Sequence, residues 1–157
     1  SRGSIRGPYG VMLHSPDVAA RVAHTGAYVR FDFTMPESLK ETVIITAAAH
    51  QKSQYEFAAH ARLARQAGVS DATIKAIADG TAPNGLTGDE ELLVRYTTEL
   101  LQDKKITDAT FNAVQEKWGV RGVVDVTTLI GHYLLVAQIL AAFDVDLAPG
   151  MTAELPV

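Results

Sequence analysis

The sequence contains no cysteine, and this absence removes several kinds of chemistry at once. Disulfide bonds, thiolate metal sites and thiol-based catalysis all require that residue. The chain also lacks a basic cluster, because its 14 Lys and Arg residues are scattered and the net charge is -4. This charge pattern argues against nucleic-acid binding. The composition is compatible with a reducing compartment, and we expect a cytoplasmic protein.

Long apolar runs are scarce as well. The first ten residues carry no apolar run of the kind found in a signal peptide. The longest run, residues 123–143, approaches the length of a membrane span. However, Asp125, His132 and Gln138 interrupt it, and no basic flank follows. We therefore interpret this run as a central helix buried on all sides and expect no membrane partner.

Strand patterns are missing too, since no segment shows sustained alternation of apolar and polar residues. Ser, Thr and Pro residues instead mark helix starts, and glycines mark helix ends. These signals predict seven helices, at residues 15–31, 36–51, 53–68, 70–79, 87–103, 107–119 and 121–143. We expect one all-α domain over residues 1–157, with an irregular start over 1–14. The tail over 144–157 should be extended and available to pack on a neighbouring subunit.

The helix expected at 53–68 carries two ionisable residues within its apolar stripe. At 100° per residue, Glu56 and His60 fall on the same side as Phe57 and Leu63. Their i,i+4 spacing allows a carboxylate and an imidazole to meet in one small volume. The carboxylate favours a charged imidazole while burial opposes it. This opposition is suited to general acid–base chemistry near neutral pH.

A purely structural interpretation stays open for the same residues. Ser53 and Glu56 match a capping box, so Glu56 would close the helix by bonding to the Ser53 amide. His60 would then be a core histidine with satisfied hydrogen bonds. Glu41 has a similar alternative, because an acid in the first turn of a helix complements its dipole.

Two further polar residues lie in the last helix. Asp125 and His132 are seven residues apart and share a face, where they would form a buried polar seam or line a pocket. Glu41, Glu56, His60 and His132 are also possible metal ligands. Diiron bundles, however, use two Glu-x-x-His motifs, whereas this chain has a single pair at i,i+4. We therefore expect no metal.

The residues around His60 resemble a known family. Glu41 precedes His60 by nineteen residues, Gln54-Tyr55-Glu56-Phe57 lies between them, and Ala67-Gly68 follows. This pattern within residues 36–79 resembles the carboxymuconolactone decarboxylase and alkylhydroperoxidase D-like family. The opening GPYGVMLHSPDVAARVAHTGAYVRF and the ending WGVRGVVDVTTLIGHYLLVAQILAAFDV are similar to its longer branch. The resemblance implies an all-α fold of helix pairs, a homo-oligomer (usually a trimer or hexamer), and a pocket near the motif helix.

The resemblance also implies one of two chemistries. In the hydroperoxidase branch, two cysteines occupy the positions of Ser53 and Glu56, with the upstream Glu at Glu41 and the His at His60. A serine cannot pass through the cysteine oxidation states, so thiol peroxidase activity is not expected. In the decarboxylase branch the motif is Glu-x-x-x-His, which matches Glu56 and His60.

The resemblance thus makes His60, Glu56 and Glu41 the candidate catalytic residues, and Ser53, Tyr55 and His132 the candidate substrate-binding residues. The function expected first is cofactor-free decarboxylation or isomerisation of a small carboxylated lactone or related carbonyl acid. The second is a non-enzymatic helical oligomer whose pocket binds a small ligand. The third, a peroxidase of the family type, is disfavoured by the absence of cysteine.

Overall fold

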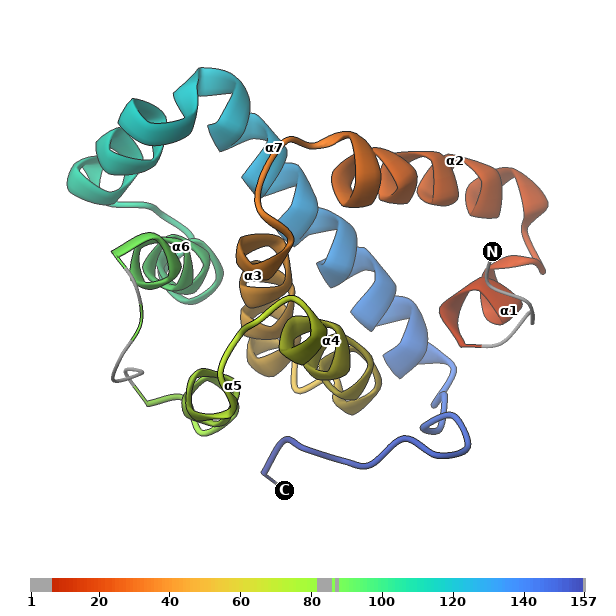
Figure 1. The fold of residues 1–157 in the computed structure, drawn as a ribbon. Helices are drawn as coiled ribbons and strands as arrows, with labels where there is room; N and C mark the ends of the chain where they lie inside the picture. The colour runs from red at the N-terminus through yellow and green to blue at the C-terminus, as the bar shows by residue number, and fades with distance from the viewer. Residues whose placement is uncertain (1–6, 82–85, 87, 157) are drawn as a thin grey trace.

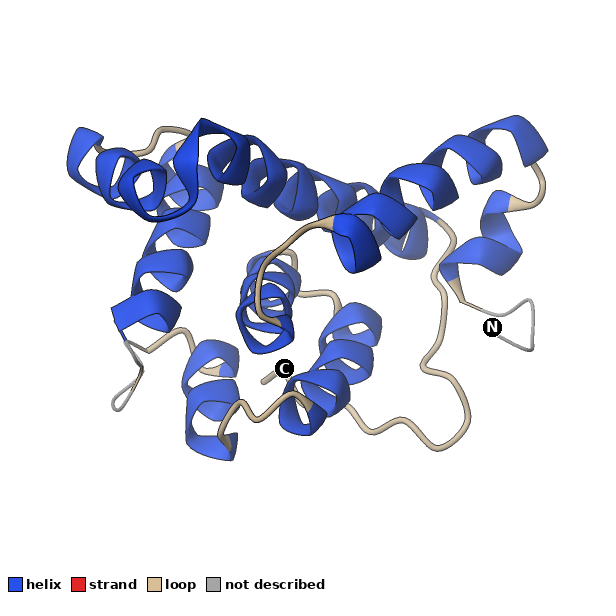
Figure 2. Ribbon diagram, turned by 45° about the horizontal axis from the view of Figure 1, so that its top comes forward, coloured by secondary structure: helices blue, strands red, loops and turns tan. Residues whose placement is uncertain are grey.

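The computed structural model describes residues 7–81, 86 and 88–156. Within these ranges the chain consists of helices and loops and has no strand, as Figure 1 and Figure 2 show. The helices are α1 (Pro8–Met12), α2 (Pro16–Ala27), η1 (Tyr28–Asp32), α3 (Glu37–His50), α4 (Gln54–Gln66), α5 (Asp71–Ala78), α6 (Gly88–Thr98), η2 (Glu99–Asp103) and α7 (Asp108–Ala142). Both η segments are π-helices. The all-α prediction is therefore confirmed.

Several helix starts follow the capping chemistry of the sequence. Ser70 and Thr107 accept hydrogen bonds from the third amide of α5 and α7, respectively. Ser15 and Ser53 occupy cap positions, but their side chains make no cap hydrogen bond. The capping box expected at Thr87 lies outside the described residues.

Two predicted boundaries differ from the structure. Residues 8–12, expected to be irregular, form the short helix α1 because Pro8 presets the first turn and Met12 packs against Ala19 and Val22. The helices expected at 107–119 and 121–143 run together as α7, bent at Gly119. Gly119 has φ 70° and ψ 174°, a conformation open to glycine, so the predicted break is a kink within one element.

The central element is α3, which packs against α4, α5, α6 and α7 (Figure 1). Residues 39–48 of α3 are all buried. One apolar cluster joins α3 to α6 and α7, and a second joins it to α4, α5 and the tail. Because Glu41 lies within this buried stretch, its carboxylate is carried into the interior, where it needs partners.

The expectation that the last helix is buried on all sides is wrong. Val120, Val124 and Leu135 of α7 are exposed to 62%, 57% and 42%, respectively. The opposite side, with Val126 and Leu129, is buried in the core. By length and composition alone α7 would qualify as a membrane span. Its buried side explains the apolar composition as that of a core helix with one exposed row.

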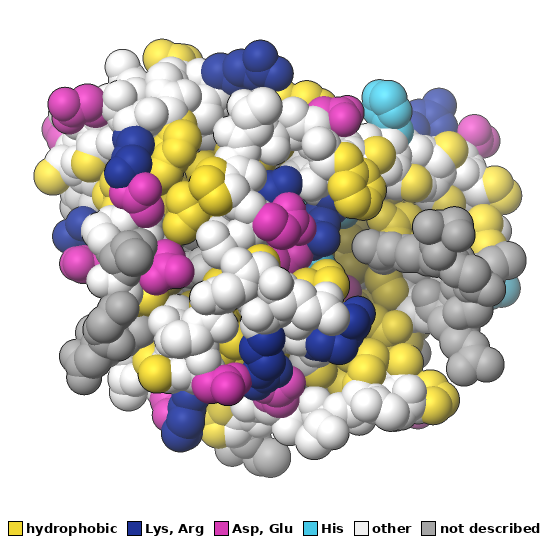
Figure 3. Space-filling model, viewed as in Figure 1, with side chains coloured by type: hydrophobic (Ala, Val, Ile, Leu, Met, Phe, Trp, Pro, Cys, Tyr) yellow, Lys and Arg dark blue, Asp and Glu magenta, His cyan; other side chains and the backbone are white. Residues whose placement is uncertain are grey.

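The tail after α7 has neither helix nor strand over its described residues, and it packs on α4 of its own chain. The Gln54 side chain donates to the Leu155 carbonyl oxygen at 2.7 Å and accepts from the Glu154 and Leu155 amides at 3.1 Å. Arg65 forms an ion pair with Glu154 at 2.6 Å. Gln54 thus binds the backbone of the tail through both its amide nitrogen and its amide oxygen. On the face seen in Figure 3, several Lys and Arg side chains lie next to Asp and Glu side chains.

Candidate active site

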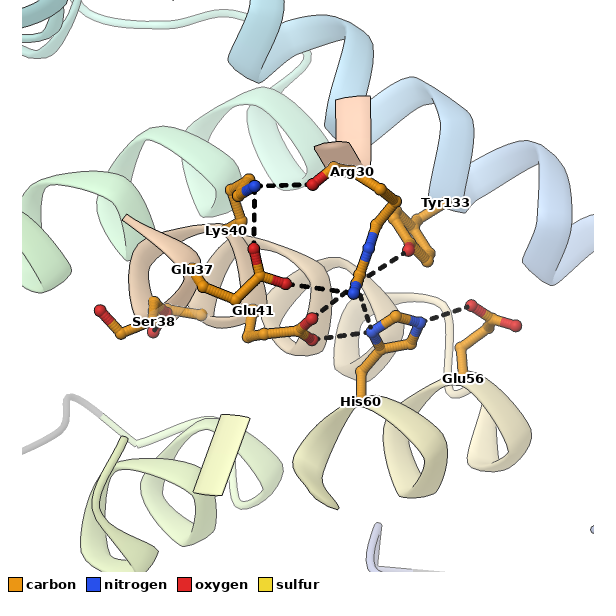
Figure 4. Close-up of polar contacts among 9 residues, drawn as sticks. Arg30, Glu37, Ser38, Lys40, Glu41, Glu56, His60 and Tyr133 are labelled. Carbon is orange, nitrogen blue, oxygen red and sulfur yellow. Dashed lines mark hydrogen bonds and ion pairs between the residues drawn. The ribbon is translucent and has the colours of Figure 1, made fainter. Parts of the chain in front are cut away.

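Glu41, His60 and Glu56 lie in one row between α3 and α4 (Figure 4). His60 Nδ1 lies 2.7 Å from Glu41 Oε2, and His60 Nε2 lies 3.7 Å from Glu56 Oε2. Glu41 is fully buried, while Glu56 and His60 are 4% and 5% exposed. One imidazole therefore has a buried carboxylate at each of its two nitrogens.

Arg30 joins this row from η1, at the end of the α2 segment. Its Nη1 donates to Glu41 Oε1 at 2.5 Å and its Nη2 donates to Glu37 Oε1 at 3.1 Å. Lys40 Nζ donates to the Arg30 carbonyl oxygen at 2.7 Å and contacts Glu37 Oε2 at 2.8 Å. Both the side chain and the backbone of Arg30 are thus held by α3. π-Helical turns often occur at functional sites, and η1 presents Arg30 to this one.

Tyr133 of α7 closes the remaining side. Its ring meets the His60 ring edge to face, with centroids 4.7 Å apart, and its hydroxyl accepts from Arg30 Nη1 at 3.4 Å. Burial raises the pKa of the Tyr133 hydroxyl, so this group stays protonated at working pH. Its oxygen accepts from Arg30 while its own proton remains a donor.

We call these seven residues the Glu41 cluster: Arg30, Glu37, Lys40, Glu41, Glu56, His60 and Tyr133. Burial alone would raise the pKa of Glu41, but the hydrogen bond and charge of His60, followed by those of Arg30, outweigh it. The pKa of Glu41 is therefore lowered, and its carboxylate is ionised.

The charged groups of the Glu41 cluster are two fixed cations, Arg30 and Lys40, and three carboxylates. The Glu37 side chain is 47% exposed, so water screens its charge, whereas Glu41 and Glu56 are buried. His60 lies between the two buried carboxylates, with Nδ1 facing the ionised Glu41 and Nε2 facing Glu56. The arrangement suits proton transfer to or from a bound molecule.

The capping-box interpretation of Glu56 does not describe this structure. In a capping box the Ser53 amide would donate to the Glu56 carboxylate. Here that amide donates to the Ala48 carbonyl oxygen at 3.0 Å. The Glu56 carboxylate instead faces His60, at the next turn of α4.

Of the three candidate substrate-binding residues, Ser53 and Tyr55 lie at the start of α4 and His132 lies on α7. Ser53 begins α4 and is half-buried. Tyr55 is also half-buried, and its hydroxyl lies so close to Gly7 that a side chain there would overlap it. His132 is buried against Gly26, and its ring meets the Tyr133 ring edge to face, with centroids 5.3 Å apart. His132 thus contacts the cluster through Tyr133.

Asp125, the other polar residue of the apolar helix, lies in a polar seam. Tyr28 Oη donates to Asp125 Oδ1 at 2.9 Å, and Arg121 Nε lies 3.6 Å from Asp125 Oδ2. We call these three residues the Asp125 seam. Of the two interpretations offered for Asp125, the seam is confirmed.

Sequence patterns identified neither Arg30 nor Tyr133 as part of the candidate site. Arg30 is separated from Glu41 by 11 residues and from His60 by 30. No periodicity relates residues that lie on different helices, so only packing could join them. Tyr133 follows His132 directly in the apolar helix. From the sequence, His132 was a candidate and Tyr133 was not.

A cavity of about 550 Å³ lies elsewhere, between α3, α5 and α6. Its lining includes Thr46, His50 and Arg95 but no member of the Glu41 cluster. Among residues 7–81, 86 and 88–156, no group of three His, Asp or Glu side chains is arranged to hold a metal ion. The candidate active site is therefore defined by the Glu41 cluster rather than by the cavity.

Together these features define an all-α protein with a buried Glu–His–Glu row clamped by an arginine. A family model described as the carboxymuconolactone decarboxylase family matches residues 16–99, which span α2 to α6 and include all of the cluster except Tyr133. Because the match covers more than half of the 157 residues, the chain belongs to that family. No curated protein matches the chain in sequence.

Proposed function

We propose that this protein is an enzyme that performs thiol-free acid–base chemistry, a decarboxylation or isomerisation, on a small carboxylated lactone or related carbonyl acid. The observation that carries the proposal is the buried contact at 3.7 Å between His60 Nε2 and Glu56, beside the contact at 2.7 Å between His60 Nδ1 and Glu41. Membership of a family that includes decarboxylases supports the same reaction class.

The proposed reaction follows from the donors and acceptors of the cluster. In a decarboxylation, the bond between the carboxylate carbon and the ring breaks, CO2 leaves, and the electron pair moves into the conjugated carbonyl as an enolate. The proton shared by His60 and Glu56 then adds to carbon, which shifts the double bond. The Tyr133 hydroxyl, protonated and oriented by Arg30, is a suitable donor to the enolate oxygen. Solvent returns the proton.

The test is turnover of a panel of lactone acids by the wild-type protein and by His60→Gln and Glu56→Gln. We expect wild-type CO2 release or double-bond migration, and a loss of kcat of about 10²- to 10⁴-fold in each variant. His24→Gln and Glu116→Gln are matched controls, because both side chains are exposed. Turnover that survives both cluster substitutions would contradict the assigned roles.

The same assays separate the alternatives. A wild-type protein that binds lactone acids without converting them would be a ligand-binding oligomer. Consumption of an organic hydroperoxide by the purified protein would indicate the peroxidase alternative. We expect no peroxide consumption, since Ser53 and Glu56 occupy the two positions that a thiol mechanism needs.

We also propose that the protein is a homo-oligomer that covers the exposed row on α7. Val120, Val124 and Leu135 follow helical spacing on one side, and exposed apolar rows of this kind are typical of subunit contacts. The test is light scattering on the purified chain and on Val124→Glu. We expect the variant to have a lower mass; Arg62→Glu, changed on the solvent side of α4, serves as control.

A further inference from the structure

Arg30 is held in place more tightly than an ordinary ion-pair partner needs to be. α3 binds its guanidinium through Glu37 and Glu41 and its carbonyl oxygen through Lys40. The Arg30 side chain is only 11% exposed. The orientation that directs Nη1 at Glu41 leaves the buried Nε of Arg30 without a hydrogen bond. An unsatisfied buried donor is costly, so the other contacts of Arg30 must offset that cost.

The contact of Arg30 Nη1 with Glu41 determines which ring nitrogen of His60 carries the hydrogen. Arg30 remains charged at any working pH, so Glu41 remains a carboxylate that can only accept hydrogen bonds. His60 Nδ1 lies 2.7 Å from Glu41 Oε2, and that distance requires a hydrogen between them. The hydrogen must therefore belong to Nδ1. Arg30 Nη1 and His60 Nδ1 lie 3.3 Å apart because both donate to the Glu41 carboxylate, and their contact is then not a hydrogen bond.

With its hydrogen on Nδ1, neutral His60 has its lone pair on Nε2, the nitrogen that faces Glu56. Without the Arg30 guanidinium, the buried Glu41–His60 pair would carry a negative charge with no cation at Glu41 Oε1, and the pair would take up a proton. A proton placed on Glu41 Oε2 donates to Nδ1, and the imidazole hydrogen then lies on Nε2. The basic nitrogen would face Glu41 instead of Glu56.

We propose that Arg30 is a positioning residue that selects the Nδ1–H tautomer of His60 and thereby directs its basic nitrogen toward Glu56. Arg30 acts through Glu41 and is not itself a proton carrier. The contacts between η1 and α3 bring the positive charge of Arg30 to Glu41 from outside the helix pair α3 and α4. It rests on the proposed function only in treating Nε2 as the working nitrogen.

The test is the tautomer of His60, observed in long-range nitrogen–proton NMR spectra of the full chain near neutral pH. The protein has five histidines, and the His60 signals are assigned by their absence in His60→Gln. We expect mainly the Nδ1–H form in the wild type and mainly the Nε2–H form in Arg30→Gln. Arg30→Lys keeps the charge and should keep the wild-type tautomer. Arg21→Gln, which removes an exposed arginine of α2, is the matched control.

An Arg30→Gln protein that is folded by circular dichroism and still shows the Nδ1–H form would overturn the proposal. If Arg30→Gln does not fold, the wild type decides: a dominant Nε2–H form there is equally fatal. The measurement needs no substrate. A tautomer reversal without turnover of any lactone acid would leave this inference standing while the proposed function fails.

Discussion

Two residues of the same π-helix each hold a buried acid, and the two acids are held very differently. Tyr28 reaches Asp125 on α7, and Arg30, two residues later, reaches Glu41 on α3. In the Asp125 seam a neutral hydroxyl donates at 2.9 Å, and the neighbouring Arg121 is 77% exposed. In the Glu41 cluster the donor is a buried guanidinium, and a histidine occupies the other oxygen of the same carboxylate.

The comparison separates a structural polar contact from a site equipped for chemistry. In the Asp125 seam the hydroxyl of Tyr28 satisfies the hydrogen-bonding need of a single acid and connects η1 to α7. The Glu41 cluster carries more buried charge than such a tie requires, and its histidine has a buried carboxylate at each ring nitrogen. Buried charge beyond structural need is the reason to regard the Glu41 cluster, and not the Asp125 seam, as the candidate active site.

The largest expected difference is in stability. Glu41→Gln removes the buried carboxylate of Arg30 and leaves it only the half-exposed Glu37. Breaking a buried ion pair costs about 3 to 5 kcal/mol of unfolding free energy. Asp125→Asn keeps a hydrogen-bond acceptor for Tyr28 and should cost about 1 kcal/mol. Urea denaturation of both variants measures the contrast, with the exposed Glu116→Gln as control. Equal losses in the two variants would remove the distinction.

The second expected difference is in the pH dependence of stability. The pKa of Glu41 is lowered in the folded protein from an ordinary value of 4.5. Its contribution is therefore complete above that value and is lost as pH falls through the lowered folded pKa. We expect the advantage of the wild type over Glu41→Gln to shrink between about pH 5 and pH 3.

Denaturation curves across that range provide the measurement. Asp125→Asn retains Glu41, so its free energy of unfolding should still fall in this pH range by the amount that Glu41 contributes. A constant difference between the wild type and Glu41→Gln at all pH values would mean that Glu41 is not held ionised by its partners.

The smallest expected effects are within the Asp125 seam. Tyr28→Phe removes the donor to the buried Asp125 carboxylate and should cost about 1 to 2 kcal/mol. Arg121→Gln removes an exposed partner that water screens, so it should have the smaller effect of the two. Thermal unfolding at one pH is sufficient to compare them. A larger effect from Arg121 than from Tyr28 would show that charge, and not the hydroxyl, sustains the seam.

Local chemistry made much of the fold predictable. Ser70, Thr107 and the proline starts act over one helical turn, so their positions alone indicated where helices begin. The apolar stretch after Glu41 likewise identified α3 as buried. The short α1 was missed, because Pro8 presets only its first turn and the packing of Met12 onto α2 completes its stability.

The i,i+4 spacing made the pairing of Glu56 with His60 predictable, because one helix fixes the distance between them. The exposure of Val120 and Val124 was not predictable, since composition shows that a helix is apolar but not which elements cover it. The same limit hid Tyr133, which reaches His60 from a helix more than seventy residues away.

The sequence by itself determined the helices, the missing thiol and the presence of two acids and an imidazole in apolar surroundings. These are properties of composition and of one-turn spacing, which the helix geometry transmits directly. Only the tertiary structure decided that Arg30 enters from η1 and Tyr133 from α7, and therefore which nitrogen of His60 faces which carboxylate. Charge and hydrogen bonding act through space, so they are settled where helices distant in sequence meet.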